Sequence, residues 1–150
     1  MALVELLLSP LPSHVSTARL VVVAAARRAG LGEDVLDEIR LAVGEACSRA
    51  VALHERYAPQ TPVRLTVMDD PAGLTLSVTD AGPAAGPVPD DPAADLLADG
   101  HDEHTDPAVA LAVLSGLVDD VQVDPTPAGT TVTLRWPLPA GAAPGTTVLA

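Results

Sequence analysis

The sequence predicts one α+β domain, a two-layer sandwich in which three helices cover one face of a mixed, mostly antiparallel sheet. The length of 150 residues suits a single domain, and a hydrophobic content of 48% is too high for a disordered chain. Segments with strand-like alternation and segments with helical spacing follow one another in the order β-α-α-β-β-loop-α-β-β. Hairpin-linked strands together with three helices are typical of a sheet that is covered on one face.

The first strand and the first helix lie at the N-terminal end. Residues 2–8 form a short apolar run that Pro10 closes, which indicates a strand. Ser13 is a typical N-cap residue, so we expect a helix over about residues 14–29. Gly30 then occupies a position at which helices commonly end.

The second helix is expected to begin near Glu33 and to end before Pro59. Acidic residues in its first turns suit the positive end of the helix dipole. Its core-facing positions recur at helical spacing. They are Leu36, Ile39, Val43, Ala46, Cys47, Ala50 and His54.

A hairpin and a long loop follow. Apolar and polar residues alternate over 63–68 and again over 74–78, on either side of a turn at 69–73, which predicts two paired strands. Residues 81–105 are rich in Pro, Asp, Ala and Gly and predict a long loop, a kind of segment that is commonly functional or disordered.

The C-terminal part supplies the third helix and the last two strands. Asp106-Pro107 is a typical helix start. Strands are expected over 121–123 and 130–136, joined by residues 125–129. We therefore place the domain at residues 1–136 and a flexible Pro/Gly/Ala-rich tail at 137–150.

Charge and cysteine content exclude several classes of function. The net charge of -12 argues against direct binding to nucleic acid or to an anionic membrane, because phosphate groups repel such a surface. No apolar run is long enough to span a bilayer, and no signal peptide is recognised. The single Cys47 cannot form an internal disulfide and suits a reducing compartment. These observations predict a cytoplasmic protein.

Four short stretches carry a resemblance through their order along the chain. They are Glu45-Ala46-Cys47-Ser48-Arg49-Ala50, Asp80-Ala81-Gly82-Pro83-Ala84, Ala108-Val109-Ala110-Leu111 and Gly129-Thr130-Thr131-Val132. Together they resemble the anti-sigma-factor serine/threonine kinases, a branch of the GHKL (histidine-kinase-like) ATPases. The resemblance implies the histidine-kinase-like ATPase fold of the Bergerat type, ATP as cofactor, and a sigma factor or an anti-anti-sigma protein as partner. It leaves a homodimer open.

The stretch on the second helix departs from the family at one position. The resemblance implies that Glu45 is the catalytic residue, and that the position of Arg49 belongs to an Asn that holds Mg²⁺. Arginine has donors only and cannot ligate a cation, so we expect no site for Mg²⁺ here. Two alternatives remain for Arg49: an ion pair with Glu45 one turn away, or direct contact with phosphates.

The base-binding stretches are partly retained. The resemblance implies that Asp80 accepts from the exocyclic amine of adenine, that Gly82 lets the loop turn, and that the Thr130 hydroxyl bridges to Asp80 through water. Ala84 replaces a second glycine. The same residues have an alternative interpretation. The stretch from Asp80 is then a turn that needs no ligand, and Thr130 is an ordinary strand residue.

The segment that binds phosphates in the family has lost its glycines in this sequence. Ala108 and Ala110 stand where the family has glycines, and Pro107 removes a backbone donor. An ordinary helix start capped by Asp106 is the alternative interpretation.

The other candidate residues give weaker indications of a function. His101 and His104 lie in the loop without a complete set of metal ligands. Cys47 falls on the core stripe and is expected to pack there, and His54 is expected to be a helix-end histidine. The resemblance implies that Arg19 contributes to the partner surface.

Two functions are compatible with these residues. The first is a regulator of transcription that binds a sigma factor or an anti-anti-sigma protein, with ATP binding weakened or lost, as in a pseudokinase. The alternative is an active ATP-dependent kinase that phosphorylates the anti-anti-sigma partner. Loss of the metal ligand and of both cradle glycines favours the first, because phosphoryl transfer depends on positioned charge.

Overall fold

The computed structural model describes residues 2–82 and 107–138, which form five strands and three helices. The elements are β1 (Ala2–Leu8), α1 (His14–Ala29), α2 (Glu33–Tyr57), β2 (Val63–Asp70), β3 (Gly73–Asp80), α4 (Pro107–Leu117), β4 (Asp120–Thr126) and β5 (Gly129–Pro137). Most of the predicted loop, with Ala84, His101 and His104, lies outside the described residues, as does nearly all of the predicted tail. No helix in the described ranges combines the length and hydropathy that a membrane crossing needs.

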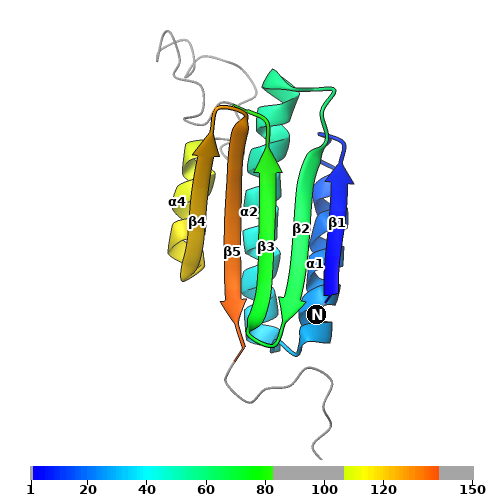
Figure 1. Cartoon of the computed structure of the whole chain (residues 1–150), viewed down its shortest axis with the longest axis vertical. Coiled ribbons are helices and arrows are strands. Elements are labelled where there is room, and N and C mark those ends of the chain that lie inside the picture. Colours follow the sequence, from blue (N-terminus) through cyan, green and yellow to red (C-terminus); the bar gives the residue numbers. More distant parts are fainter. Residues whose placement is uncertain (1, 83–106, 139–150) are drawn as a thin grey trace, which may run out of the picture.

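The five strands form one open sheet in the order β1-β2-β3-β5-β4. Figure 1 shows α1, α2 and α4 together behind this sheet, so the predicted two-layer sandwich is confirmed. The sheet was expected to be mixed and mostly antiparallel, and every pairing in the described residues is antiparallel. Short hairpins join β2 to β3 and β4 to β5, and such connections can produce only antiparallel neighbours.

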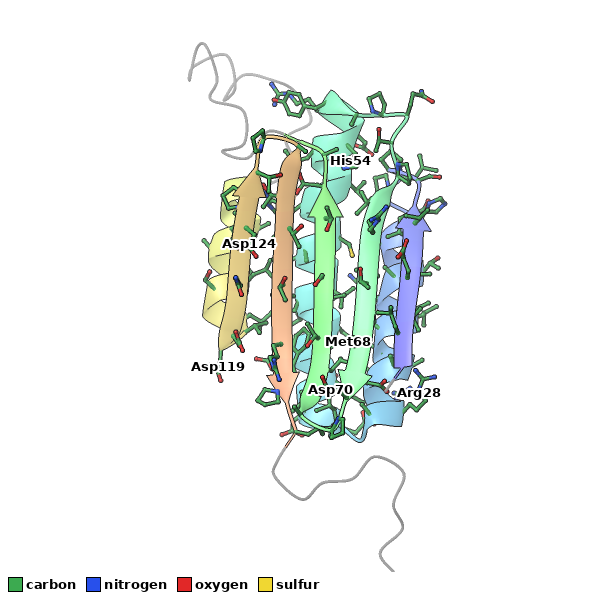
Figure 2. All side chains as sticks on the ribbon, in the orientation of Figure 1. Arg28, His54, Met68, Asp70, Asp119 and Asp124 are labelled. Atoms are coloured by element: carbon green, nitrogen blue, oxygen red, sulfur yellow. The ribbon has the colours of Figure 1, made fainter. Side chains whose placement is uncertain are left out.

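Strand alternation assigns one set of side chains to the core and the other to the uncovered face. In β3, Leu74, Leu76 and Val78 are buried beneath the helices. The intervening Thr75, Ser77 and Thr79 lie on the uncovered face, which Figure 2 views directly. Two hydroxyl pairs join β3 to β5 on that face, Thr79 to Thr131 at 3.0 Å and Ser77 to Thr133 at 3.4 Å.

The core consists mainly of small and branched aliphatic side chains, as expected from a sequence without Phe. The seven predicted core positions of α2 are all buried. Trp136, the single Trp, is also buried at the end of β5 and donates its indole N–H to Glu38 Oε2 at 3.1 Å. This bond ties the last strand to the first part of α2.

Two local predictions were wrong. Ser13 occupies the N-cap position, but its hydroxyl makes no capping hydrogen bond. The expected 125–129 connection is shorter, because β4 continues to Thr126 and pairs Pro125 with Thr130. β4 is an edge strand, and an edge strand can hold a proline because one side of its backbone has no strand partner.

Candidate functional site

Four buried polar or charged residues stand out in the aliphatic core of the described chain. They are Arg49, His54, Asp80 and Thr130. The first two lie in the C-terminal half of α2, and the other two face each other where β3 ends and β5 begins. Three of the four belong to the stretches singled out from the sequence, so the fold brings those stretches together at one end of the sheet.

The register of β3 explains why a carboxylate is buried here. Asp80 continues the alternation of Leu74, Leu76 and Val78, so it lies on the helix-covered side of the sheet. Arg49 lies on α2, which packs across this side. A charged side chain at that position needs a partner, since desolvating an isolated charge is very unfavourable.

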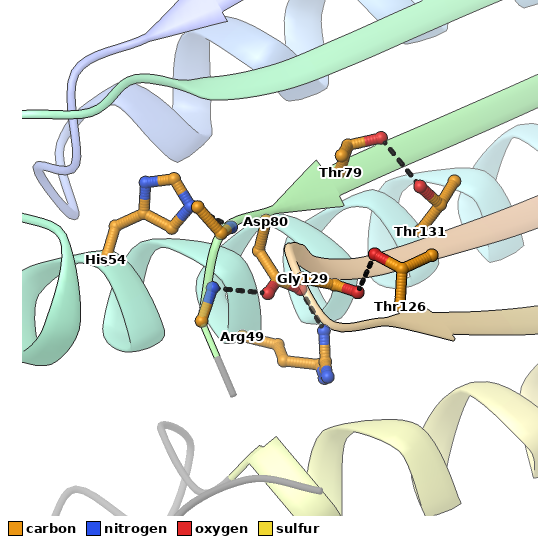
Figure 3. A network of polar contacts seen from close by, with 9 residues as sticks. Arg49, His54, Thr79, Asp80, Thr126, Gly129 and Thr131 are labelled. Carbon is orange, nitrogen blue, oxygen red and sulfur yellow. Dashed lines mark hydrogen bonds and ion pairs between the residues drawn. The ribbon is translucent and has the colours of Figure 1, made fainter. Parts of the chain in front are cut away.

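Arg49 and Asp80 form a buried ion pair (Figure 3). Arg49 Nη1 donates to Asp80 Oδ2 at 2.7 Å, and the two side chains are 2% and 0% exposed. The other carboxylate oxygen, Oδ1, accepts from the backbone N–H of Gly82 at 2.9 Å. Both oxygens of Asp80 are therefore engaged by groups of the protein itself.

The pairing corrects one expectation for Arg49. The alternative ion pair with Glu45, one turn earlier on α2, is not formed, because the guanidinium turns to Asp80 instead. Glu45 is half-buried, and the described residues provide no ion-pair partner for it. Direct contact between Arg49 and phosphates stays a prediction.

His54 fixes the segment that follows β3. Its Nδ1 bonds to the Thr61 carbonyl oxygen at 2.7 Å, while its Nε2 accepts from the Ala81 N–H at 2.8 Å. Because a backbone N–H can only donate, the ring proton lies on Nδ1. The spacing along α2 placed His54 correctly on the core face, but its role as a bridge between two loops was missed. No sequence signal marks it, since both partners are backbone groups.

Two glycines allow the close approach of backbone segments around Asp80. Gly129 has φ +148°, and a Cβ there would collide with the Asp80 carbonyl oxygen. A Cβ at Gly82 would lie 3.0 Å from Leu53 Cβ on α2. Gly129 is thus required by the contact between the start of β5 and the end of β3.

Within the part of the chain that the structure describes, two buried atoms at the site have no hydrogen-bond partner. They are Arg49 Nε and Thr130 Oγ1. Thr130 is the register partner of Asp80 across the β3–β5 pairing. A buried polar group costs about 1–3 kcal/mol when neither protein nor water satisfies it.

The remaining predicted residues lie elsewhere. Ala110 is buried on α4, and Ala108 lies in the first turn of that helix. Arg19 lies between α1 and α2, where its Nε donates to the Arg40 carbonyl oxygen at 3.2 Å. A Cβ at Gly44 would lie 2.5 Å from Arg19 Nη2, so this glycine makes room for the guanidinium.

Cys47 packs in the core, as predicted. Burial raises the pKa of its thiol to about 12, and the positive charge of Arg19 offsets a smaller part of that rise. The thiol is therefore protonated and inert at neutral pH.

The residues at this end of the sheet differ in two respects from those that the resemblance implies for magnesium-ATP. The guanidinium of Arg49 offers no lone pair to a metal ion, and it occupies the carboxylate expected to receive adenine. Within residues 2–82 and 107–138, no three His, Cys, Asp or Glu side chains gather as a metal site.

Comparisons with known proteins agree with this fold. The family described as histidine kinase-like ATPase domain matches residues 8–136. A solved structure of the RsbU and RsbW domains of Rv1364c from Mycobacterium tuberculosis aligns with a TM-score of 0.62 at 18% identity. The alignment covers 90% of this chain and 32% of that one, so this chain spans about a third of the length of the solved chain. A search of curated protein sequences gave no match. The match over residues 8–136 establishes that the chain belongs to the histidine kinase-like ATPase domain family.

Proposed function

We propose that this protein is a cytoplasmic regulator of the anti-sigma type, which binds a sigma factor or an anti-anti-sigma protein. We also propose that its adenine site is closed, in the sense that Arg49 occupies the carboxylate that would receive adenine. Family membership and the fold shared with a structure containing an RsbW domain support the regulator class. The resemblance of the four ordered stretches supports the class of partner. The Arg49–Asp80 pair supports the closed site.

The closure rests on competition for a single carboxylate. In the family, the residue matching Asp80 accepts from the amine of adenine, but here Arg49 Nη1 is already its donor. Separating the two leaves a buried charge unpaired, which costs about 3–5 kcal/mol. A ligand that has to separate them binds about 10²–10⁴-fold more weakly than it would to a free carboxylate.

Phosphoryl transfer is weakened at further positions. Ala108 and Ala110 leave less room for phosphates than glycines, and Arg49 supplies no metal ligand. Glu45 is retained, but a base without a positioned metal and phosphate can add little. We therefore propose that regulation proceeds through protein binding, with kinase activity weak or absent.

Calorimetric titration with ATP, with and without Mg²⁺, tests the closed site directly. We expect no binding or weak, magnesium-independent binding by the wild-type protein. In Arg49→Asn, which restores an amide oxygen and frees Asp80, we expect tighter binding of ATP. Magnesium-dependent ATP binding by the wild type, with phosphate transferred to a partner serine, would show that the protein is an active kinase instead.

The partner class is tested by co-purification from the native cell. Recovery of a sigma factor or of an anti-anti-sigma protein supports the proposal. The Arg19→Ala variant examines the partner surface, and Arg64→Ala, an exposed arginine on β2, is the matched control. Recovery of neither class contradicts the proposed partners, whatever the result with ATP.

A further inference from the structure

The edge strand β1 is apolar on both of its faces, and Glu5 is its one charged residue. Val4 and Leu6 pack against the core from the helix-covered side and stay partly exposed. Leu3 and Leu7 lie on the uncovered face and are 65% and 59% exposed. A strand that reads as an almost continuous apolar run is typical of the interior of a sheet. In the described residues, however, β1 has β2 as its single strand neighbour.

The opposite edge of the same sheet is built differently. Figure 1 shows β1 at one edge and β4 at the other. β4 carries exposed Asp120 and Asp124, and Pro125 interrupts its series of backbone donors. Charged side chains and proline are the usual devices that prevent an edge strand from pairing with another chain. β1 contains neither proline nor lysine, so this contrast indicates that its free edge is used for pairing.

A strand that is added to β1 would contact both of its faces. The main-chain groups of the free edge would give hydrogen bonds, and alternate side chains would give specificity. On the uncovered face the added side chains would lie opposite Leu3, Glu5 and Leu7. On the helix-covered side they would lie opposite Val4 and Leu6. The edge therefore fits a segment that is apolar at four positions and has a different kind of residue opposite Glu5.

Charge determines the residue opposite Glu5. The Glu5 side chain is 51% exposed, and Arg64 Nε lies 3.9 Å from its Oε1 in an exposed pair that contributes little. A lysine or arginine on the added strand would form a favourable cross-strand pair with Glu5. In a second copy of β1, the antiparallel alignment that pairs Leu3 with Leu7 places Glu5 opposite Glu5. The net charge of -12 on each copy adds to this repulsion, so the edge favours a different protein.

We propose that the free edge of β1 binds an extended segment of another protein, which adds a sixth, antiparallel strand to the five-stranded sheet. This segment carries a lysine or arginine opposite Glu5, with apolar residues on either side. The proposal does not depend on the closed adenine site, because two strand positions separate β1 from β3, which carries Asp80.

A pair of synthetic peptides tests this surface. The first is acetylated and amidated Thr-Leu-Val-Lys-Val-Leu-Thr, which brings two leucines and the lysine opposite Leu3, Leu7 and Glu5. The control peptide has glutamate in place of the lysine and also reproduces the charge of a second copy of β1. In calorimetric titrations without nucleotide, we expect the lysine peptide to bind about three- to tenfold more tightly. Equal affinities, or no binding of the lysine peptide, would overturn the proposal.

Charge reversal assigns the contact to one residue. Glu5→Lys should invert the preference, so that the glutamate peptide binds more tightly. Glu55→Lys, at an exposed position near the end of α2, changes the net charge equally and should leave the preference unchanged. The double variant Leu3→Thr/Leu7→Thr should weaken binding of the lysine peptide about three- to tenfold, because it removes two apolar cross-strand contacts. Leu20→Gln, at an exposed leucine on α1, is its control.

Hydrogen exchange distinguishes strand addition from general adhesion. Backbone amides of β1 should gain protection in the presence of the lysine peptide, and protection confined to the helices would overturn the proposal. Sedimentation without peptide provides a second test. A stable dimer that the Leu3→Thr/Leu7→Thr variant dissociates would show that a second copy occupies the edge instead.

These outcomes are independent of the proposed function. Peptide binding at β1 supports this inference even where co-purification recovers neither a sigma factor nor an anti-anti-sigma protein. Recovery of such a partner by a protein that binds neither peptide overturns the strand addition and leaves the proposed function standing.

Discussion

Replacing Asp80 with Asn removes one charge of the buried ion pair and turns the oxygen that accepts from Arg49 into an N–H donor. The Asn oxygen can still accept from Gly82, so the change isolates the interaction with Arg49. Arg49 would then be a buried guanidinium without a counter-charge, because its side chain is only 2% exposed. We expect the free energy of unfolding to fall by about 3–5 kcal/mol. For a chain of this length the melting temperature should fall by roughly 6–20 °C.

The single variant Arg49→Met and the double variant Arg49→Met/Asp80→Asn complete a double-mutant cycle with the wild type. In the double variant neither charge remains buried, so most of the loss should be recovered. Urea unfolding followed by fluorescence measures each free energy, with Trp136 as the single buried reporter. Similar m-values across the set would show that the unfolded state is unchanged.

An exposed ion pair provides the control. Glu5 and Arg64 lie 3.9 Å apart on β1 and β2, with about half or more of each side chain in solvent. Glu5→Gln should change stability by less than about 1 kcal/mol. A loss of that small size for Asp80→Asn would refute the argument, because it would mean that solvent or another group already compensates Arg49.

The remaining predictions concern single residues. Gly129→Ala should prevent stable folding or lower the melting temperature strongly, since its Cβ would enter the end of β3. Gly116→Ala, where no atom lies within 4 Å of a new Cβ, should stabilise α4 by up to about 1 kcal/mol in the same thermal assay. Cys47 should resist thiol reagents at pH 8 in the folded protein and react once urea unfolds it, because burial raises its pKa to about 12. The folded state holds this proton more tightly than the unfolded state, whose thiol pKa is near 9.0, so stability should fall as pH rises from 9 to 12. His54→Phe should cost about 2–6 kcal/mol in urea unfolding, because two loop backbone groups lose their partner. His14→Phe, at a partly exposed histidine, should cost far less, and equal losses would contradict the bridging role.

The elements of the fold were predictable because their signals are local. Alternation over the β2–β3 hairpin gave both strands and the side of the sheet on which each residue lies. Helical spacing along α2 identified its buried face, including Cys47 and His54. These patterns follow from the periods of 2 and 3.6 residues, which hold wherever one side of an element is buried.

The contacts of the candidate site were less accessible to sequence reasoning. For Arg49 the local rule offers Glu45, four residues away, but the observed partner Asp80 is 31 residues distant. The separation of two residues along the chain does not tell which acidic residue of the sheet will lie next to Arg49 on the helix. Ser13 shows the same limit, because its type predicted a cap and its backbone conformation there is helical instead.

The hydroxyl-lined face of the sheet has a consequence for how the strands find their pairing. Threonine has the branched shape that strands favour, yet it adds little that would draw two copies of the protein together. A slip by one residue would bring Leu74, Leu76 and Val78 into water and force Thr75 and its neighbours into the core. The same alternation that fills the interior therefore penalises every shifted alignment, and it gives the β3–β5 part of the uncovered face polar side chains.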